Sequence, residues 1–422
     1  MSEREPRIRN RWWIVVGCTV GMIFSTGPLI QFSFGVFIKP VSEAFHADRG
    51  RASFALLVAL CVCALLTPLV GRLVDRFGVR RIGAPCIALF AISFGFIGLA
   101  STSVWLYIGC YALAGIFGAG QTTLIYAKAI AAAFDSKRGL ALGIAISGVG
   151  LGTALIPRLA QHFISILGWR HAYLALGAVT LMVALPALLL FVREGGPAAS
   201  RIVTRDIALQ GLTGSEALRS RLFWTLATAF FLVAVALAGV MAHIVPMMTD
   251  RGVPAETASL ALSSGGIALI AGRLIAGYIL DFVFAPFVAL FFFALPLLGI
   301  GILLTSSSVA LSVVAGILIG TSLGAEVDLI AYLQSRYFGL RRFGEIYGYL
   351  LAIFMVGSGV GPFELGVAYV HFGNYSAALA GLGVCLACAC ASMLTFPAYA
   401  FGNHDRSATA SLDRREALVE RG

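Results

Sequence analysis

The chain reads GRLVDRFGVRR at residues 71–81 and GYILD at residues 277–281, in both cases at the end of a long apolar run. Each segment places a glycine four residues before an aspartate, and the two glycines lie 206 residues apart. A second pair, Phe134 and Arg138, recurs at nearly the same distance as a phenylalanine and an arginine 204 residues further on. Two independent matches at nearly one offset indicate a duplicated unit, with one copy in each half of the chain.

The composition is that of a membrane protein. Of 422 residues, 59% are hydrophobic and only 12% are charged, and the mean hydropathy is +0.93. Soluble domains carry about 25% charged residues, which they need to cover their surface. These values exclude a soluble enzyme, a nucleic-acid-binding protein and a disordered chain. We therefore attribute the net charge of +10 to basic residues in loops.

Apolar segments long enough to cross a bilayer, about 20 residues each, recur twelve times along the chain. They cover residues 12–38, 52–74, 82–101, 104–131, 139–166, 171–192, 222–247, 257–280, 286–306, 308–334, 343–370 and 374–398. Six crossings return a chain to the side from which it started, so the two copies have the same orientation. We therefore expect an all-α membrane protein with twelve transmembrane helices in two parallel six-helix repeats.

The predicted organisation is an N-terminal six-helix bundle over residues 1–192 and a C-terminal one over residues 222–400, joined by a cytoplasmic linker over residues 193–221. A cytoplasmic tail follows over residues 401–422. With the N-terminus inside, 22 of the 30 lysine and arginine residues fall on the cytoplasmic side, 5 on the outer side and 3 within spans. This excess predicts a multi-pass protein of the bacterial inner membrane with both termini in the cytoplasm.

No motif for an enzyme, a nucleotide or a metal stands out. The CxxC spacing of Cys385 and Cys388 lies in a continuous apolar run without a second such pair, which favours small buried side chains over a metal site. A G-x-x-x-x-G-K-[ST] phosphate-binding loop is absent from the sequence, so we expect ion or solute gradients, rather than ATP, to supply any work. The protein is expected to need no cofactor.

The segment at residues 71–81 resembles, almost residue for residue, the signature loop of the major facilitator superfamily. In that superfamily the loop packs against the eleventh span and latches the cytoplasmic face, so the resemblance implies the major facilitator fold and alternating access between two halves. The resemblance gives this latch role to Gly71, Asp75, Arg76, Gly78 and Arg80, and in the second half to Gly277 and Asp281.

Finer matches resemble the branch of monocarboxylate transporters and oxalate:formate exchangers. They are FDSKRGLALG at residues 134–143, FGVFIKP at residues 34–40 and RLFW at residues 221–224. RLIAGYILD at residues 273–281 is similar to the stretch that carries the family's substrate arginine. Two positions depart from related patterns. AGIFG at residues 114–118 lacks the arginine of many proton-coupled members, and Phe354 stands where the oxalate exchangers have a lysine.

Arg273 is the leading candidate for substrate binding. It is expected about 8 Å to the cytoplasmic side of the middle of its span, at a rise of about 1.5 Å per residue. A charge at that depth costs at least about 2.5 kcal/mol on insertion scales. A guanidinium fork matches a carboxylate through two hydrogen bonds, so we expect Arg273 to bind an organic anion. The alternative is a fixed ion pair with an acid of the tenth span.

Glu326 and Asp328 lie at a similar depth in the tenth predicted span. They are two residues apart, about 200° around a helix, and so point in different directions. Asp328 shares a face with Gly320 and Gly324, which indicates close helix packing there. Glu326 points elsewhere, and one hypothesis is that it faces the cavity and carries a coupling proton. A structural charge pair is the rival interpretation.

Other polar side chains within the spans are further candidates. Arg158, as a second cation opposite Arg273, would suit a dianion or a larger acid, and a contact with lipid phosphate is the alternative. The hydrogen-bonding candidates for the cavity wall are Tyr126, Gln121 and Gln31. His243, near the outer end of the seventh span, is expected to be a solvated histidine of the gate region.

Together these features predict a secondary transporter that moves small organic anions, above all monocarboxylates, across the inner membrane by alternating access coupled to protons. An anion exchanger for dicarboxylates and a transporter of a larger or neutral metabolite are the alternatives. A receptor on this fold would need an added soluble domain, and a channel would not need duplicated latch loops. The expected partners are the anion, protons and the lipid bilayer, and the protein is expected to act as a monomer.

Overall fold

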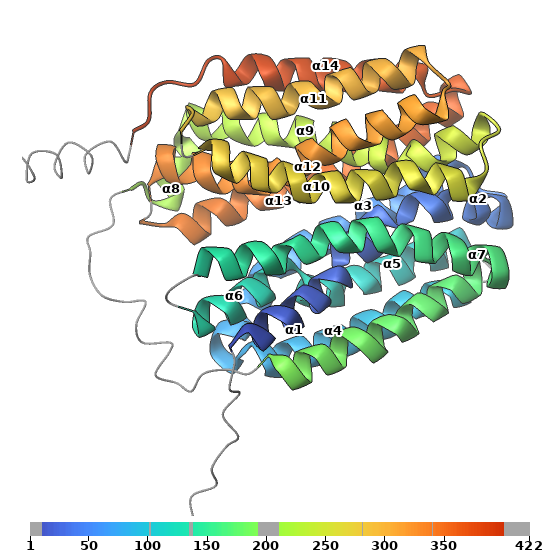
Figure 1. The fold of residues 1–422 in the computed structure, drawn as a ribbon, viewed down its shortest axis with the longest axis horizontal. Helices are drawn as coiled ribbons and strands as arrows, with labels where there is room; N and C mark the ends of the chain where they lie inside the picture. Colours follow the sequence, from blue (N-terminus) through green and yellow to red (C-terminus); the bar gives the residue numbers. More distant parts are fainter. Residues whose placement is uncertain are drawn as a thin grey trace, which may run out of the picture.

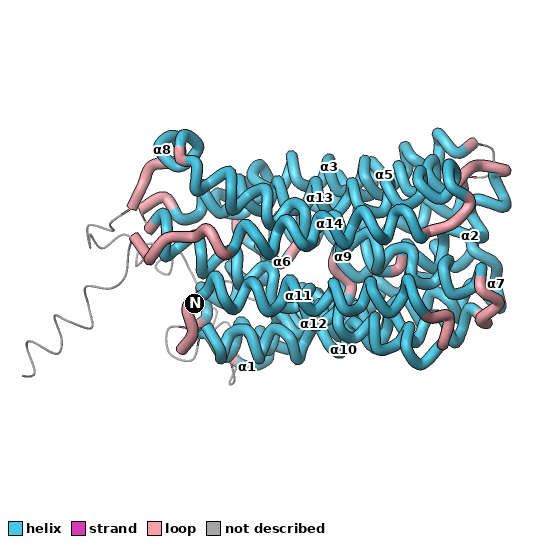
Figure 2. The backbone as a smooth tube through the Cα atoms, turned by 90° about the horizontal axis from the view of Figure 1, so that it is seen from above, coloured by secondary structure: helices cyan, strands magenta, loops and turns pink. Residues whose placement is uncertain are grey.

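The computed structural model describes residues 11–100, 103–134, 138–192, 211–280, 282–339 and 341–400, apart from the side chains of residues 75, 131, 132, 138–140 and 343. These parts of the chain form helices that lie side by side along one common direction (Figures 1 and 2). The only β pairing among them is a single bridge between Gly211 and Gly339. The expected all-α fold is confirmed.

The first half of the chain begins with an interrupted crossing and ends with a long, bent one. Its elements are α1 (Trp12–Ile23), the π-helix η1 (Gly27–Phe32), α2 (Phe34–Phe45), α3 (Arg49–Phe77), α4 (Val79–Phe96), η2 (Ile97–Leu99), α5 (Val104–Gly118), η3 (Ala119–Gln121), α6 (Thr123–Ala133) and α7 (Arg138–Phe191). The break after α1 precedes Pro28, which lacks the N–H group that a continuous α-helix requires at that position.

The second half opens with the short helix α8 outside the apolar spans. Its elements are α8 (Gly214–Arg219), α9 (Arg221–Asp250), α10 (Ala255–Leu280), α11 (Ala285–Thr305), α12 (Val309–Phe338), α13 (Phe343–Phe372) and α14 (Ser376–Met393). A capping box begins α8, because Thr213 and Glu216 each accept a hydrogen bond from the other's backbone N–H. The bond donated by Thr213 lowers the pKa of the Glu216 carboxyl.

The number of membrane crossings agrees with the prediction. Eleven described segments are long and apolar enough to cross a membrane. One of them, Ala141–Phe191 within α7, has 51 residues, which is enough for two crossings of about 20 residues each. Gly168 divides it, because a φ of 76° lies in the left-handed region that favours glycine and interrupts the helix. The described residues therefore contain the twelve predicted crossings.

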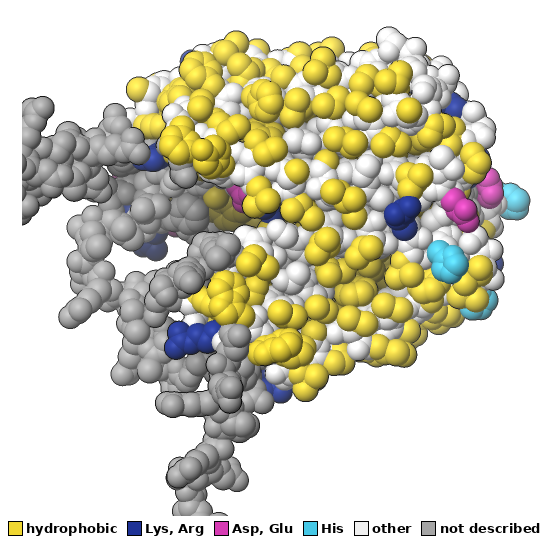
Figure 3. Space-filling view, in the orientation of Figure 1, with side chains coloured by type: hydrophobic (Ala, Val, Ile, Leu, Met, Phe, Trp, Pro, Cys, Tyr) yellow, Lys and Arg dark blue, Asp and Glu magenta, His cyan; other side chains and the backbone are white. Residues whose placement is uncertain are grey.

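The bundle has two distinct ends. One end, here called the linker end, carries Val192 and Gly211, which flank the segment between the halves (Figure 1). The opposite end, here called the far end, carries the turns that follow α2, α9 and α13. Hydrophobic side chains cover much of the visible flank between these ends, whereas acidic and histidine side chains gather at the far end (Figure 3). Such a flank suits contact with lipid.

Helices of the two halves occupy separate parts of the molecule and meet along two seams. In Figure 1 the blue and green helices α1–α7 fill the lower part, and the yellow to red helices α9–α14 fill the upper part. One seam joins α3 to α13, and the other joins α7 to α10. Near the far end α2 also packs against α9. These seams are where any movement of one half against the other has to occur.

Candidate functional site

Arg273 lies in the last third of α10 and pairs with an acid of α12. Its Nε is 3.1 Å from Oδ2 of Asp328 and 3.4 Å from the carbonyl oxygen of Gly324. The Arg273 side chain is 14% exposed, and its Nη1 is buried without a hydrogen-bond partner in the part of the chain that the structure describes. Tyr347 of α13 lies close enough to interact electrostatically with both Arg273 and Asp328. The charge pair named above as the alternative thus exists, and it leaves part of the guanidinium unpartnered.

Close contact between α10 and α12 brings this pair together. A Cβ added to Gly324 would overlap the carbonyl oxygen of Leu269, and one added to Gly320 would overlap that of Gly265. Only glycine therefore lets the two backbones approach this closely. The prediction that Asp328 shares the close-packing face of its helix is confirmed.

Glu326 is buried within the second half. It is 1% exposed, and neither of its carboxyl oxygens has a hydrogen-bond partner among the described residues. Gln334, two turns further along α12, is also fully buried with its amide nitrogen and oxygen unpartnered. An unpaired charge is costly in such surroundings, so a partner must come from elsewhere or the Glu326 carboxyl must be neutral.

Gln121 and Tyr126 bind their own half of the protein. The Tyr126 hydroxyl donates to Oε1 of Gln121 over 2.7 Å, and Nε2 of Gln121 lies 3.3 Å from the carbonyl oxygens of Gly21 and Phe24. Both side chains are 0% exposed. They join the interruption of the first crossing to that of the fourth, where Thr26 also donates to the carbonyl oxygen of Gly118 over 2.7 Å. In this structure their hydrogen bonds are therefore used inside the bundle.

Arg158 and Gln31 occupy different environments. Arg158 is exposed and shares a face of α7 with Leu151 and Leu155, which are 39% and 55% exposed. That face points outward, towards the region a bilayer would fill, and so favours the lipid or headgroup contact. Gln31 is half-buried in η1 and makes no hydrogen bond among the described residues. Of these two predicted site residues, Gln31 is the one placed near the middle of the bundle.

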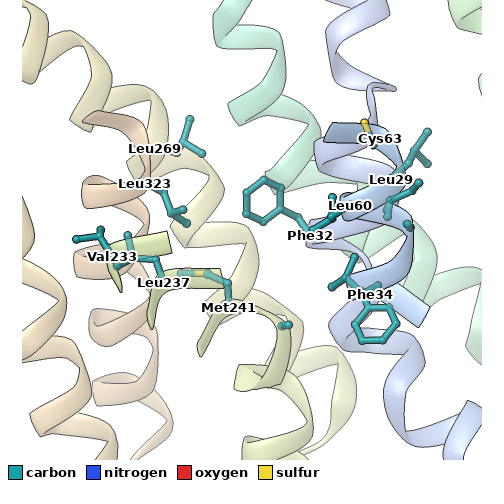
Figure 4. Close-up of a cluster of buried hydrophobic side chains, with 14 of the residues drawn as sticks. Leu29, Phe32, Phe34, Leu60, Cys63, Val233, Leu237, Met241, Leu269 and Leu323 are labelled. Atoms are coloured by element: carbon teal, nitrogen blue, oxygen red, sulfur yellow. The ribbon is translucent and has the colours of Figure 1, made fainter. Parts of the chain in front are cut away.

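Between the two halves, the middle of the bundle is apolar. Figure 4 shows Phe32 directed from the first crossing towards the second half, with Leu237 and Met241 of α9 opposite it. Leu323 of α12 and Leu269 of α10 lie beside them. All five side chains are at most 9% exposed. A solute passing between the halves would meet hydrocarbon surface here, with the Arg273 guanidinium nearer the linker end.

The two aspartates of the predicted latch, the Asp75 side chain and the whole of Asp281, lie outside the described residues. The flanking glycines are in open surroundings. A Cβ on Gly277 would meet nothing within 4 Å, and one on Gly71 would meet only Leu124 of the same half. Gly78 adopts a φ of 96°, which favours glycine at the turn between α3 and α4. Arg76 and Arg80, on either side of that turn, are exposed.

At the far end, by contrast, the halves are held together by charge. Arg49 at the start of α3 contacts Asp250 at the end of α9 through two hydrogen bonds, Nη1 to Oδ2 at 2.5 Å and Nη2 to Oδ1 at 2.8 Å. Lys39 of α2 lies 3.5 Å from the same carboxylate. The Arg49 guanidinium also lies over the Tyr369 ring, 4.0 Å from its centroid, and donates to the Tyr375 hydroxyl over 2.6 Å.

His243 belongs to this far-end cluster and corrects the expectation of a solvated histidine. It is 0% exposed. Its Nδ1 lies 3.2 Å from the Tyr375 hydroxyl, and its Nε2 lies 2.9 Å from the carbonyl oxygen of Pro362 and 3.4 Å from Oγ of Ser53. Close packing of α9 on α13 and α14 of its own half, and on α2 of the other half, excludes water from the ring. The sequence placed His243 in the gate region, but burial depends on helices from both halves.

The sequence predictions miss the charged and aromatic residues of the far-end cluster. Arg49, Asp250 and Tyr375 lie at the ends of predicted spans, where charged and aromatic side chains are ordinary. Arg49 and Asp250 are 201 residues apart, and no spacing rule connects them. The one available signal was that Asp250 is an acid beside a span that is otherwise uncharged from Leu222 onward.

Comparisons with known proteins agree with this architecture. The family model described as Major Facilitator Superfamily matches residues 14–362. The uncharacterized MFS-type transporter YcxA of Bacillus subtilis is 27% identical over 386 residues, covering 82% of this chain and 91% of that protein. Human monocarboxylate transporter 11 is 29% identical over 279 residues, covering 64% of this chain and 56% of that protein.

A solved structure also shares the fold. A bacterial homologue of the human lysosomal transporter Spinster, in an inward-facing and unoccupied conformation, superposes with a TM-score of 0.66 at 18% identity. The match covers 92% of this chain and 95% of that protein. The family model spans most of the chain, and the helical arrangement is that of the same fold. The chain therefore belongs to the Major Facilitator Superfamily and is a multi-pass membrane transporter, not an enzyme.

Proposed function

We propose that this protein is a secondary transporter of small organic anions, above all monocarboxylates, and that Arg273 binds the substrate carboxylate. The observation that carries the proposal is that only part of the Arg273 guanidinium is hydrogen-bonded. Its Nε contacts Asp328 and Gly324, whereas Nη1 is buried without a partner. A carboxylate can take up the remaining donors, which would satisfy the buried nitrogen and balance the charge. Similarity to proteins named monocarboxylate transporters supports this substrate class.

The apolar middle of the bundle favours an acid with one charge and an apolar body. Phe32, Leu237 and Met241 offer no hydrogen-bonding group to a second carboxylate. Arg158, which as a second cation would have suited a dicarboxylate, faces outward from α7. A second ionised group placed among these side chains would therefore be desolvated without compensation. For this reason we place the dicarboxylate exchanger second.

Proton coupling follows from the same charge pair. While Asp328 is ionised, it competes with a substrate carboxylate for Arg273. A proton on Asp328 would release the guanidinium, so substrate and proton would bind together. Glu326, the other acid of α12, is buried without a partner among the described residues, and its neutral form would add no charge to the site. We therefore assign the coupling proton to Asp328 and keep Glu326 as the alternative.

Alternating access is the proposed mechanism, with the linker end in the cytoplasm of a bacterial cell. The distribution of lysine and arginine supports this orientation. In the described state the far end is bridged by Arg49 and Asp250, whereas Gly277 near the linker end has nothing within 4 Å of an added Cβ. We infer that this is the state open to the cytoplasm, from which Arg273 can release its anion.

Uptake into proteoliposomes tests the proposal. Purified protein would be assayed with lactate, a branched-chain monocarboxylate, an aromatic monocarboxylate and a dicarboxylate, with and without an inward proton gradient. We expect uptake of at least one monocarboxylate, increased by the gradient and lost in Arg273→Ala. Arg158→Gln is the matched control and should transport normally. Transport of a neutral solute only, or equal uptake by Arg273→Ala, would contradict the proposal.

A further inference from the structure

We propose that His243 is a proton-binding site that controls opening of the far end, and that a proton bound there from that side holds the gate formed by Arg49 and Asp250 open. The observation behind this inference is a continuous chain of hydrogen bonds across the seam between the halves. It runs from Arg49 through the Tyr375 hydroxyl to His243 and on to the carbonyl oxygen of Pro362. The inference rests on the proposed alternating access, but it concerns a site remote from Arg273.

The geometry of this chain suits a neutral histidine. The Pro362 carbonyl can only accept, so Nε2 of His243 must carry its hydrogen. The Arg49 guanidinium can only donate, so the Tyr375 oxygen accepts from it and the Tyr375 hydrogen points to Nδ1 of His243. Nδ1 is therefore the acceptor that completes the chain. A proton on Nδ1 would remove that acceptor and oppose the Tyr375 hydrogen.

The charges around His243 also oppose a proton while the gate is closed. Arg49 faces it from α3 and Lys39 lies nearby on α2, with Asp250 on α9 as the only acid of the cluster. The remaining groups that face it are neutral: Ser53 of α3, Tyr369 and Pro362 of α13, and Tyr375 before α14. Two cations and one anion already leave an excess positive charge, and the ring is 0% exposed. A further positive charge without water would be costly.

Opening the far end changes both the burial of His243 and the charges around it. Once α3 moves away from α9 and α13, water reaches the imidazole and Arg49 no longer lies against it. A solvated histidine binds a proton near pH 6.5. The closed gate therefore favours neutral His243, whereas the open gate accepts the proton. By linkage, acidifying the outer solution raises the ratio of open to closed molecules by up to about tenfold per pH unit.

This proton has a different role from the one assigned to Asp328. Because closing the gate expels it, it cannot accompany the anion through the protein. It sets how many molecules are open to the outside, and so how many can load a substrate. Acid outside the cell would then favour loading even before any proton moves with the anion.

Distance measurements without a substrate test the inference. Spin labels would be placed at Ala44 of α2 and Glu256 of α10 through a genetically encoded keto amino acid, which leaves the eight cysteines in place. Both positions are exposed at the far end and lie in different halves. In wild type we expect one short distance at pH 7.5 and a growing population of a longer distance as the pH falls to 5. No lengthening at any pH would overturn the proposal.

Three variants identify the responsible group. In His243→Gln the amide can still donate to Pro362 and accept from Tyr375 but cannot be protonated in this range, so the short distance should persist at pH 5. His171→Gln removes an exposed histidine instead and should behave like wild type. A wild-type response in His243→Gln would overturn the proposal and point to Asp250.

Tyr375→Phe breaks the chain without touching a charge, and it should open the gate at a higher pH than in wild type. It provides the test should His243→Gln fail to elute as monodisperse protein, and an unchanged pH response in Tyr375→Phe would overturn the proposal. Because the measurement uses no anion, its outcome is independent of whether Arg273 binds carboxylates. A working gate in a protein that transports none of the tested acids would reject only the proposed function.

Discussion

At the scale of single residues, Arg273 and Asp328 form an ion pair within the apolar spans of the second half. They lie 3.1 Å apart, with side chains 14% and 34% exposed. An ion pair in such a place contributes little net stability, because desolvation offsets much of the attraction, yet removing one partner is expensive. An unpaired charge is costly here. We therefore expect a substrate carboxylate to replace Asp328 at Arg273 only when a proton neutralises Asp328.

Two substitutions of Arg273 distinguish the contribution of its charge from that of its planar guanidinium donors. Arg273→Lys keeps the charge but loses the planar donors, so binding of the preferred carboxylate should weaken roughly tenfold or more, about 1.4 kcal/mol. Arg273→Ala should abolish binding and, by leaving Asp328 unpaired, cost up to about 3–5 kcal/mol of stability. The measurement is the thermal shift produced by a panel of carboxylates on monodisperse protein. Equal stabilisation of wild type and Arg273→Ala would show that this arginine does not bind the anion.

The two acids of α12 are expected to differ in their effect on coupling. Asp328→Asn cannot load a proton, so it should retain substrate exchange and lose accumulation driven by a pH gradient. Glu326→Gln should retain both, because the coupling proton is assigned to Asp328 and the amide keeps the size of the Glu326 carboxyl. Counterflow and gradient-driven uptake in the same proteoliposomes distinguish the two activities. The reverse pattern would assign the coupling proton to Glu326.

At the scale of helices, close backbone contacts fix the position of α10 against α12. Gly272, Gly320 and Gly324 each lie where a Cβ would overlap a carbonyl oxygen of the facing helix. The first half uses another device, since the first and fourth crossings are both interrupted and exchange hydrogen bonds through Thr26 and Gln121. Rigid contacts inside each half are what let the halves move as units.

Widening the contact between α10 and α12 should cost stability and function together. Gly272→Ala places a methyl group against the carbonyl oxygen of Thr321, so we expect a loss of about 1–3 kcal/mol and a lower melting temperature. Gly301→Ala on α11 is the matched control, because nothing lies within 4 Å of its added Cβ. It should melt at the wild-type temperature or slightly above it. Melting curves that coincide for Gly272→Ala and wild type would reject this account of the packing.

At the scale of the whole molecule, the two ends of the bundle differ in how the halves meet. The far end is closed by Arg49, Asp250 and the buried ring of His243. Near the linker end, a Cβ added to Gly71 would meet only Leu124 of the same half, and one added to Gly277 would meet nothing within 4 Å. Alternating access requires the opposite arrangement in the other state, with the linker end closed and the far-end pair separated.

Asp75 is the residue expected to hold the linker end in that other state. Asp75→Asn removes its charge and should leave expression and melting temperature unchanged while slowing anion exchange several-fold, because the state closed at the linker end loses a contact. The spin-label distance across the far end should also remain short over a wider pH range. Wild-type exchange rates at normal expression would show that Asp75 does not act as a latch.

Hydropathy, repeat spacing and the basic loop at residues 71–81 were sufficient to predict twelve crossings and the superfamily, because a bilayer imposes a length and a polarity on every segment that crosses it. The same local rules predicted that Arg273 would need a counter-ion or a ligand. They could not choose between the two, since that depends on the register of α10 against α12. Burial of Gln121, Tyr126 and His243 likewise depends on contacts between segments about 100 residues apart or more. Only tertiary packing brings Arg49 to Asp250. Two charges attract through space, so the partners need no regular spacing in the sequence.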